Sequence, residues 1–192
     1  YMNTIWSTYV QSIGTLYESR VLRFSDMFRS KYMDIFKIDD KKRFLEIGCG
    51  PGALAEALGR WYPGAQIYGI DRDSNFIDFA RKTAPHIEFT EGDATELPYE
   101  NNSFDVTISN TVAEHIEPEK FYGEQYRVLK EDGVCIVLSA RKGINISAQC
   151  IKGETDFEKE IWKRVEKYYK EIDEKYEVCA YPQSEMEMPL CM

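Results

Sequence analysis

Apolar residues recur at intervals of three or four over the first 37 residues of the chain. They are Ile5, Tyr9, Ile13, Leu16, Phe24, Phe28, Tyr32 and Ile35. This spacing places apolar side chains on one side of a helix. We therefore expect two N-terminal helices separated near Gly14 or Ser19, followed by a polar connection at residues 39–42.

From residue 43 onward, short apolar runs alternate with amphipathic segments. The predicted strands are 43–48, 66–71, 87–93, 103–110 and 134–139, and the predicted helices are 53–62, 74–84 and 118–130. Ser74 is the expected N-cap of its helix, Pro118 lies in a first turn, and Asp132 and Gly133 form a turn. This order predicts an α/β fold, a doubly wound, mostly parallel sheet with right-handed crossovers. Residues 1–40 would form a helical cap on a domain at 41–192.

The pattern changes after residue 140. Apolar residues at 157, 161, 165, 168 and 172 form one stripe of a charged helix, whose charges we expect to be solvated. Ser184 and Glu187 have the spacing of a capping box, and residues 176–181 are a short strand candidate.

Composition narrows the function classes. The net charge of −9 disfavours nucleic-acid binding, which depends on Lys and Arg neutralising phosphates. No apolar run approaches the roughly 20 residues that span a bilayer. The five cysteines are scattered, without a zinc spacing or a disulfide framework, which favours reduced thiols and a cytoplasmic location. No His, Cys or carboxylate cluster has ligand spacing, so we expect no metal.

Three glycines, Gly48, Gly50 and Gly52, lie between the apolar run at 43–48 and the helix at 53–62. A glycine-rich turn between strand and helix at the carboxyl edge of a parallel sheet is typical of a ligand crevice. The spacing G-x-G-x-G differs from the dinucleotide fingerprint G-x-G-x-x-G. Glu46 would also repel a pyrophosphate and favour an ammonium or sulfonium group.

The segment "LEIGCGPG" resembles the first motif of the class I S-adenosylmethionine-dependent methyltransferases. "YGIDRD", "EGDATELPYENNSFDVTISN" and "YRVLKEDGVCIVLS" resemble the following motifs in the family's order, over residues 43–141. The resemblance implies S-adenosyl-L-methionine as cofactor, S-adenosyl-L-homocysteine as product, and in-line methyl transfer to a small-molecule acceptor. It requires no catalytic side chain. The oligomeric state is not predicted.

The resemblance also implies site residues. The backbone of Gly48, Cys49 and Gly50 would lie along the methionine part of the cofactor, and Gly52 would belong to the same cofactor-binding loop. Glu46 would orient this loop or the ammonium. A second set lies at later strand ends: Asp71 for the ribose hydroxyls, Arg72 for the adenine face, Asp93 and Ala94 for the adenine edge, and Asn110 for the methyl-transfer site. Other interpretations stay open, because Asp71 could cap a helix, Asp93 could form an Asx turn, and Arg72 could be solvated.

The remaining assignments are less specific. His115 could be a general base, contact substrate, or only pack under the cap, whereas His86 is expected to be structural. Tyr17, Arg20 and Arg23 could reach the cofactor carboxylate if the first helix folds over the glycine loop. The N-terminal aromatic residues could belong to the core or cover the cofactor.

Two other functions are compatible with the same predicted fold: an NAD(P)-dependent oxidoreductase and a cofactor-binding protein without catalysis. The resemblance also fails after residue 141, since the family closes its sheet with two further strands that this sequence lacks. The strand at 134–139 would then have a bare edge. We therefore expect the chain to be an incomplete view of a longer protein.

Overall fold

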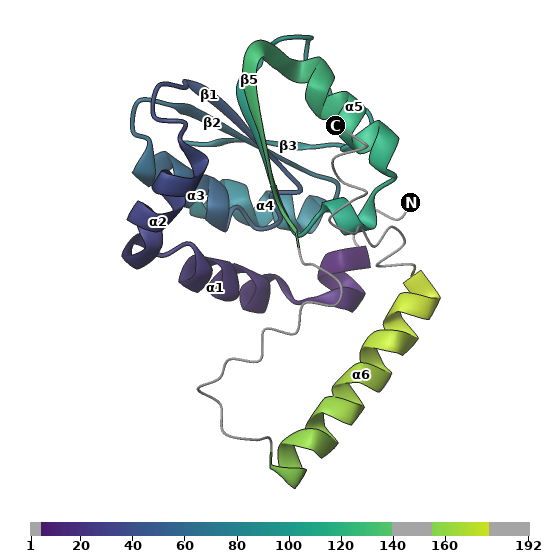
Figure 1. Cartoon of the computed structure of the whole chain (residues 1–192). Helices are drawn as coiled ribbons and strands as arrows, with labels where there is room; N and C mark the ends of the chain where they lie inside the picture. Colours follow the sequence, from purple (N-terminus) through teal and green to yellow (C-terminus); the bar gives the residue numbers. More distant parts are fainter. Residues whose placement is uncertain (1–4, 140–154, 177–192) are drawn as a thin grey trace.

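The computed structural model describes residues 5–139 and 155–176, and five parallel strands form its sheet (Figure 1). The strands are β1 (Arg43–Ile47), β2 (Gln66–Asp71), β3 (Glu88–Glu91), β4 (Phe104–Asn110) and β5 (Leu129–Leu138), in the order β3-β2-β1-β4-β5. The chain builds one half of the sheet outward from β1 and then returns to add β4 and β5 on its other side. This order confirms the predicted α/β fold and places a topological switch point between β1 and β4, where parallel sheets bind ligands.

Helices cover both faces of the sheet. Helices α3 (Ala53–Trp61) and α4 (Ser74–Thr83) pack on one face, and α5 (Pro118–Val128) packs on the other. Neighbouring residues of β1 therefore enter different clusters, with Phe44 on the α3 side and Leu45 on the α5 side. A strand buried on both faces needs apolar residues at successive positions, which explains the continuous runs in the sequence.

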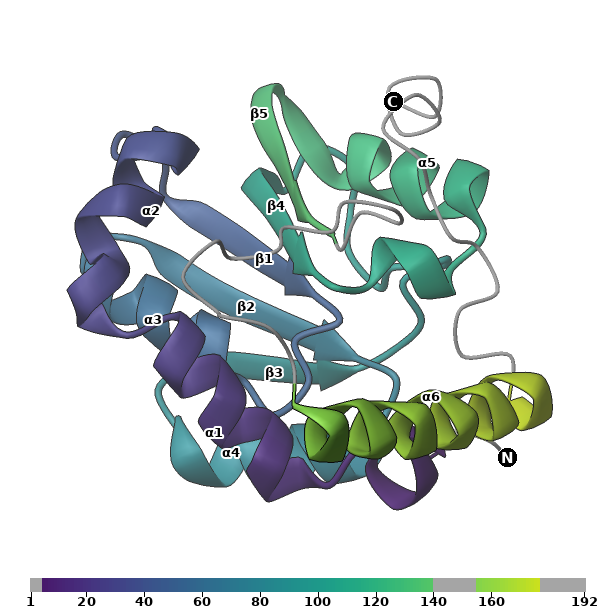
Figure 2. The same cartoon turned by 60° about the horizontal axis from the view of Figure 1, so that its bottom comes forward.

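The N-terminal segment forms the cap. It contains a π-helical turn (Trp6–Val10), α1 (Ile13–Arg23), a 3-10 turn (Asp26–Phe28) and α2 (Arg29–Phe36). Helix α1 runs across the carboxyl ends of the strands, as two views show (Figures 1 and 2). The predicted helix break at Gly14 or Ser19 is wrong, because both residues lie inside α1. The chain leaves helical geometry at Ser12 and Ser25, which are extended N-cap residues.

Two local predictions needed correction. The N-cap of α4 is Asp73, whose side chain accepts the Asn75 N–H, and Ser74 is the first residue of the helix. The turn expected at 132–133 lies within β5, which begins at Leu129 directly after α5. Phe104 pairs with Leu129 and Val106 with Val134, so the strand bulges between these two pairs.

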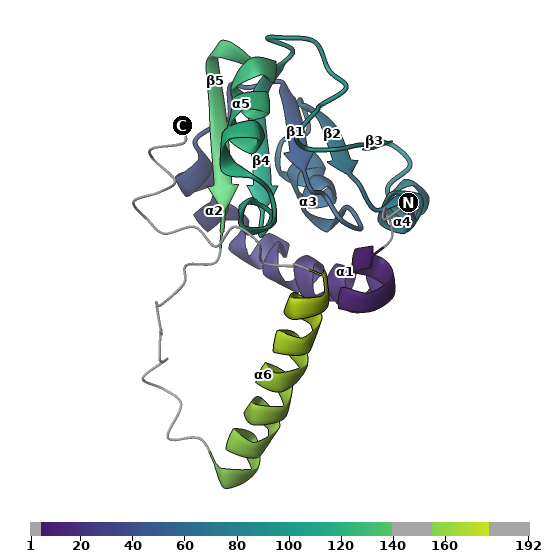
Figure 3. The same cartoon turned by 90° about the vertical axis from the view of Figure 1, so that its right-hand side faces the viewer.

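Helix α6 (Asp156–Tyr176) confirms the predicted charged helix and extends away from the sheet (Figure 3). Its apolar residues Phe157, Ile161 and Tyr168 are exposed, while the ring of Tyr176 stacks on Tyr9 of the cap at 5.3 Å. Strand β5 is the outer strand of the described sheet. The capping box at 184–187 and the strand candidate beyond residue 176 lie outside the described residues. Within the described residues, no helix has the length and apolarity needed to cross a membrane.

Candidate ligand-binding site

A cavity of about 1170 Å³ lies between the carboxyl ends of the strands and the cap. Typical small-molecule sites enclose roughly 300–1,000 Å³, so this cavity has room for a cofactor and a second molecule. Of the site residues predicted in the sheet domain, all except Gly52 line it: Glu46, Gly48, Cys49, Gly50, Asp71, Arg72, Asp93, Ala94, Asn110 and His115. The fold thus brings the sequence candidates into one space.

The three glycines of the loop after β1 all have positive φ, but they differ in what excludes a side chain. A Cβ at Gly48 would collide with Val112, and one at Gly52 would lie 2.9 Å from Phe89 and 3.0 Å from Ala80. Gly50 meets only a methyl group of Leu16, at an ordinary 3.6 Å. Protein packing therefore explains Gly48 and Gly52, and only Gly50 leaves open space toward the cavity.

Glu46 is a buried carboxylate at the end of β1, with only 2% of its surface exposed. Burial raises its pKa well above the usual range, and the charge of Asp71 adds to this, whereas the Ala55 N–H and Arg20 oppose it. Oxygen Oε2 has no hydrogen-bond partner. A buried acceptor without a partner is costly, so the site suits a ligand that donates hydrogen bonds or carries positive charge.

Asp71, at the end of β2, connects the glycine loop to the next turn. Its Oδ2 accepts the Gly50 N–H at 2.8 Å, and its Oδ1 accepts the Asp73 N–H at 2.8 Å. Burial raises the pKa of Asp71 to about 6, although these two N–H donors lower it. Each carboxylate oxygen keeps a further lone pair, so the side chain can also accept two ligand hydroxyls.

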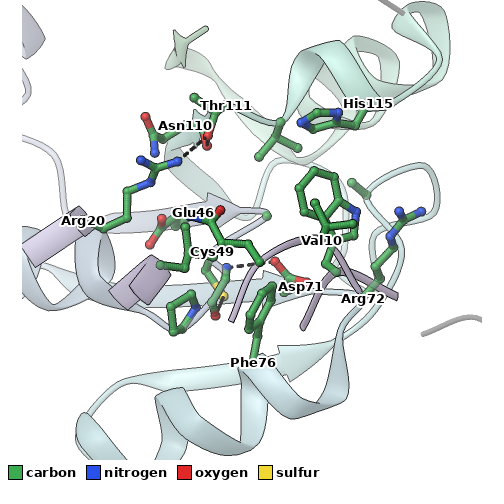
Figure 4. Close-up of a pocket in the computed structure, with 18 of the residues that line it drawn as sticks. Val10, Arg20, Glu46, Cys49, Asp71, Arg72, Phe76, Asn110, Thr111 and His115 are labelled. Atoms are coloured by element: carbon green, nitrogen blue, oxygen red, sulfur yellow. Dashed lines mark hydrogen bonds between the residues drawn. The ribbon is translucent and has the colours of Figure 1, made fainter. Parts of the chain in front are cut away.

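Arg72, Asp93 and Ala94 line the cavity as well, and Arg72 lies beside Asp71 (Figure 4). Arg72 is exposed and reaches along the rim (Figure 4). Asp93 is exposed too, and its Oδ1 accepts both the N–H and the hydroxyl of Thr95 at 2.8 Å. The Asx-turn interpretation of Asp93 is therefore correct as local geometry, and its other oxygen is available to a ligand.

The end of β4 supplies polar groups on the other side of the cavity. Asn110 is buried, and its Oδ1 has no hydrogen-bond partner. Thr111 has a φ of 54°, in the left-handed region that a β-branched residue rarely adopts. Its hydroxyl donates to the Asn110 carbonyl at 2.7 Å and accepts a hydrogen bond from Arg20 at 3.0 Å. Such local strain at a cavity wall is common at functional sites.

The cap closes the cavity with aromatic and charged side chains. The ring of Trp6 meets that of His115 edge to face, with centroids 4.7 Å apart. Of the three cap residues proposed to reach a ligand carboxylate, only Arg20 lines the cavity. Tyr17 instead donates to Glu56 at 2.8 Å, and Arg23 is exposed beside the Phe24 ring.

A polar tether holds the beginning of the cap to the domain. The buried carboxylate of Asp73 accepts the Ser7 N–H at 2.8 Å through Oδ2 and the Ser7 hydroxyl at 2.9 Å through Oδ1. The same carboxylate caps α4, so one side chain fixes two elements beside the cavity. Sequence analysis did not anticipate this role of Asp73.

Other cavity residues were missed as well. They come mostly from the cap and from the segment after β4, including Val10, Leu16, Thr111, Val112, Glu114 and Ile116, whereas Trp6 is one of the N-terminal aromatic residues for which a covering role was an open alternative. Glu114 is buried, and its Oε2 accepts from the Ser139 hydroxyl at 3.3 Å. Glu114 lies three residues before Glu117, the N-cap of α5, and a carboxylate at that position gives no signal of burial in the sequence. Within the described ranges, no cluster of three or more His, Cys, Asp or Glu is placed to hold a metal ion.

Sequence comparison links this site to known proteins. Residues 45–137 match the family described as "Methyltransferase domain". The fatty-acid O-methyltransferase of Mycolicibacterium smegmatis is 36% identical over 109 residues, which are 55% of this chain and 39% of that protein. The demethylmenaquinone methyltransferase of Thermus thermophilus is 35% identical over 116 residues, 58% of this chain and 53% of that protein. The chain thus spans about two fifths to one half of these relatives.

A solved structure supports the fold. The geranyl diphosphate C-methyltransferase of Streptomyces coelicolor, crystallised with S-adenosyl-L-homocysteine, superposes with a TM-score of 0.59 at 15% identity. The match covers 85% of this chain and 57% of that one. The family match spans the glycine loop, Asp71, Asp93 and Asn110, all of which lie between β1 and the end of β4. With methyltransferases among its sequence relatives and the fold of a solved methyltransferase, residues 45–137 of this chain form a methyltransferase domain.

Proposed function

We propose that this protein transfers a methyl group from S-adenosyl-L-methionine to a small, largely apolar acceptor. The observation that carries the proposal is the buried Glu46 carboxylate beside the glycine loop, with an oxygen that no protein group satisfies. An ammonium group of the cofactor would supply the missing donor and the opposite charge. The family match of residues 45–137 supports this choice of ligand.

We propose the following positions for the cofactor. The backbone of Gly48, Cys49 and Gly50 would lie along its methionine part, and Asp71 would accept from both ribose hydroxyls. Arg72, Asp93 and Ala94 would surround the adenine, and Asn110 would flank the methyl group. Gly52 does not line the cavity and is excluded from this set, since its role is to let α3 begin against Phe89 and Ala80.

The bound cofactor supplies an electrophilic methyl group on a sulfonium, which a lone pair of the acceptor attacks while the C–S electron pair returns to sulfur. The protein's part is to align the partners and to exclude water. Trp6 and Leu16 of the cap line the cavity and can help to exclude water from it. His115 packs on Trp6, which favours a structural role for its ring.

The acceptor side of the cavity is apolar in our proposal. Trp6, Val10, Val112 and Ile116 contribute apolar side chains to the lining of the cavity, and the ring of Trp6 lies against His115. An acceptor with substantial hydrocarbon surface would bury it there favourably. The names of two relatives, a fatty-acid and a demethylmenaquinone methyltransferase, support an apolar acceptor class.

We also propose that residues 1–40 act as the lid of the methyltransferase domain at 41–192, and that the protein works in the cytoplasm. The tether from Ser7 to Asp73 supports the first point, because it links the lid directly to the domain. The described cysteines Cys49 and Cys135 are free thiols, as is usual in a reducing compartment.

The test is methyl transfer from labelled S-adenosyl-L-methionine to a panel of fatty acids, quinols, phenols and amines. We expect label in an apolar acceptor, and a large loss of transfer in the Asp71→Ala variant. Binding of S-adenosyl-L-homocysteine with no transfer to any acceptor would favour the non-catalytic alternative. The relatives named above do not support the oxidoreductase alternative. Stabilisation of the folded protein by NADH would be evidence in its favour.

A further inference from the structure

The second half of the cap exposes a group of large apolar side chains that takes no part in the cavity. They are Leu22 with 72% of its surface exposed, Met27 with 81%, Phe28 with 37% and Ile35 with 70%. None of these four is among the residues that line the cavity. Single exposed apolar side chains are ordinary, whereas a group of them marks an interaction surface. We call these four residues the cap patch.

Packing on the domain fixes which side of α2 faces outward. The inner side carries Tyr32, whose ring stacks on that of Trp61 at 5.4 Å. On the outer side, the Nζ of Lys31 lies 5.9 Å from the centre of the Phe28 ring. Ile35 follows Lys31 by one helical turn, so it lies on the same side of the helix. The exposed apolar residues of α2 and of the turn before it are thus grouped around a lysine.

The segment around the cap patch is locally cationic. Residues 21–37 contain four exposed basic side chains, Arg23, Arg29, Lys31 and Lys37. They contain two acidic residues, of which Asp26 already pairs with Arg60 at 3.4 Å. The whole chain, by contrast, has a net charge of −9. Basic groups beside exposed apolar ones are complementary to a lipid surface that carries negative charge.

The exposed apolar side chains of α6 lack this charge pattern. Residues 156–176 contain six basic and seven acidic residues. Several of the basic side chains pair within the helix, as Lys167 does with Glu171 at 3.8 Å. Helix α6 therefore offers no excess of positive charge, and the cap patch is the better match for an anionic surface.

Helix α1 connects the cap patch to the cavity. Leu16 lines the cavity, and Leu22 lies six residues further, about 9 Å along the helix. The acceptor proposed above is apolar, and apolar molecules partition from water into lipid. A protein that lies on a bilayer through its cap would meet such an acceptor beside its own cavity.

We infer that the cap patch binds the surface of an anionic lipid bilayer, with its apolar side chains among the headgroups and its basic neighbours at the lipid phosphates. The inference goes beyond the proposed function, because lipid binding requires neither cofactor nor methyl transfer. Such a contact is reversible, since a few half-inserted side chains and a few charges contribute to it.

The experiment is co-sedimentation of the full chain with vesicles, without cofactor or acceptor. One set of vesicles is phosphatidylcholine alone, and the other is an equal mixture of phosphatidylcholine and phosphatidylglycerol. We expect binding to the mixed vesicles that weakens as the salt concentration rises, because salt screens the exposed charges. Binding to phosphatidylcholine alone should be at least about tenfold weaker, since the basic residues then lose their partners.

Variants locate the contact. Joint replacement by Leu22→Ser, Met27→Ser and Ile35→Ser should lower the partition coefficient on mixed vesicles at least about tenfold, because apolar surface is removed from the contact. Lys31→Gln should lower it about fivefold, the effect of one basic residue near an anionic surface. Tyr126→Ser is the matched control and should change nothing. Tyr126 is 82% exposed and lies on α5, away from α2 (Figures 1 and 2).

The outcomes separate the possible occupants of the cap patch. Absence of binding, equal binding to both kinds of vesicle, or equal losses in Tyr126→Ser and the triple variant would overturn the inference. Sedimentation velocity without vesicles tests a second copy of the chain as the occupant. A dimer that the triple variant abolishes would assign this surface to self-association and overturn lipid binding.

Two checks keep the result interpretable. Circular dichroism measures whether each variant is folded, and substitutions at exposed positions should leave the fold intact. The salt dependence and the comparison of the two vesicle types use only the unmodified protein. Binding of S-adenosyl-L-homocysteine is measured separately, so failure of lipid binding and failure of the proposed function give different results.

Discussion

At the residue scale, the site is controlled by buried carboxylates whose ionisation the fold makes costly. Burial raises the pKa of Asp71 to about 6, compared with about 3.9 in an unfolded chain. A raised pKa stabilises the folded ligand-free protein below about pH 4, and this contribution is lost as the pH rises through about 6. Hydrogen-bond donors of a bound ligand would lower the pKa of Asp71, because they stabilise the ionised carboxylate.

This reasoning predicts a pH dependence of binding. Protonation removes acceptor capacity from Asp71, so affinity for S-adenosyl-L-homocysteine should fall about tenfold between pH 7 and pH 5, on the basis of a pKa about one unit above pH 5. Calorimetry across this range checks it. In Asp71→Asn the part of the pH dependence of binding that is centred near pH 6 should disappear. The charged neighbours Glu46, Asp73 and Arg72 are unchanged in that variant. An unchanged slope in that variant would assign the titration to another group.

In the glycine loop, two similar substitutions should differ in how much they destabilise the folded protein. Gly52→Ala forces a Cβ against Phe89 and Ala80 at a φ of 87°, so it should destabilise the protein by about 2–4 kcal/mol. Gly50→Ala meets only an ordinary contact with Leu16, so backbone strain should cost about 1–2 kcal/mol.

Urea unfolding measures these costs, and calorimetry of the folded fraction measures binding. Gly50→Ala should also weaken S-adenosyl-L-homocysteine binding, since its new methyl group enters the open space beside the loop. The reverse order of stabilities, or full affinity in Gly50→Ala, would disprove the different roles assigned to these two glycines.

At the scale of elements, the lid depends on a small number of contacts with the domain. Ser7 donates twice to Asp73, and its hydroxyl also accepts from the Asn75 side chain at 3.0 Å. The ring of Tyr9 stacks on that of Tyr176, and the ring of Trp6 meets His115 edge to face. Because few buried contacts hold the π-helical turn, local opening of this segment should require much less free energy than global unfolding.

Ser7→Ala tests this coupling. Loss of the hydroxyl should make opening of residues 6–10 about 1 kcal/mol easier, equivalent to roughly fivefold faster amide exchange. Hydrogen exchange by mass spectrometry measures it. Ser12→Ala is the control, since the Ser12 hydroxyl contacts only Thr15 within the lid. Equal protection of residues 6–10 in both variants would show that the tether does not hold the lid.

Strand and helix positions in the sheet domain could be predicted from the sequence, but positions in the cap could not. The strand at 66–71 and the helix start at Pro118 are confirmed, because period and turn residues agree there. In the N-terminal segment, the helices are interrupted at Ser12 and Ser25. These interruptions follow from packing on the domain, which the local spacing of apolar residues does not encode. Asp73 was not predicted as the N-cap of α4, because Ser74, one position later, has an equally good side chain for capping.

The site could be predicted where a residue follows a strand. Asp71 and Asn110 lie at strand ends, so the topology alone brings them to the same edge of the sheet. Thr111 and Glu114 were not predicted, because their positions depend on how the loop after β4 folds under the lid. Gly52 was assigned to the ligand by its motif, whereas its neighbours Phe89 and Ala80 provide the physical reason for a glycine.

At the scale of the whole molecule, the sheet and the lid enclose a cavity of about 1170 Å³ whose lining includes both charged and apolar side chains. Carboxylates lie at the strand ends, and aromatic and aliphatic groups lie under the lid. A charged cofactor and an apolar acceptor would each meet a matching wall. In the described part of the chain, β5 forms the outer edge of the sheet and α6 carries a stripe of exposed apolar side chains.

We propose that this cavity binds S-adenosyl-L-methionine through Asp71 and the glycine loop. Titration calorimetry with S-adenosyl-L-homocysteine is the test. We expect one site per chain, no heat with NADH, and a loss of about 1.5–3 kcal/mol of binding free energy in Asp71→Ala, the scale for hydrogen bonds to a charged group. No binding of S-adenosyl-L-homocysteine, or undiminished affinity in a folded Asp71→Ala variant, would contradict the claim.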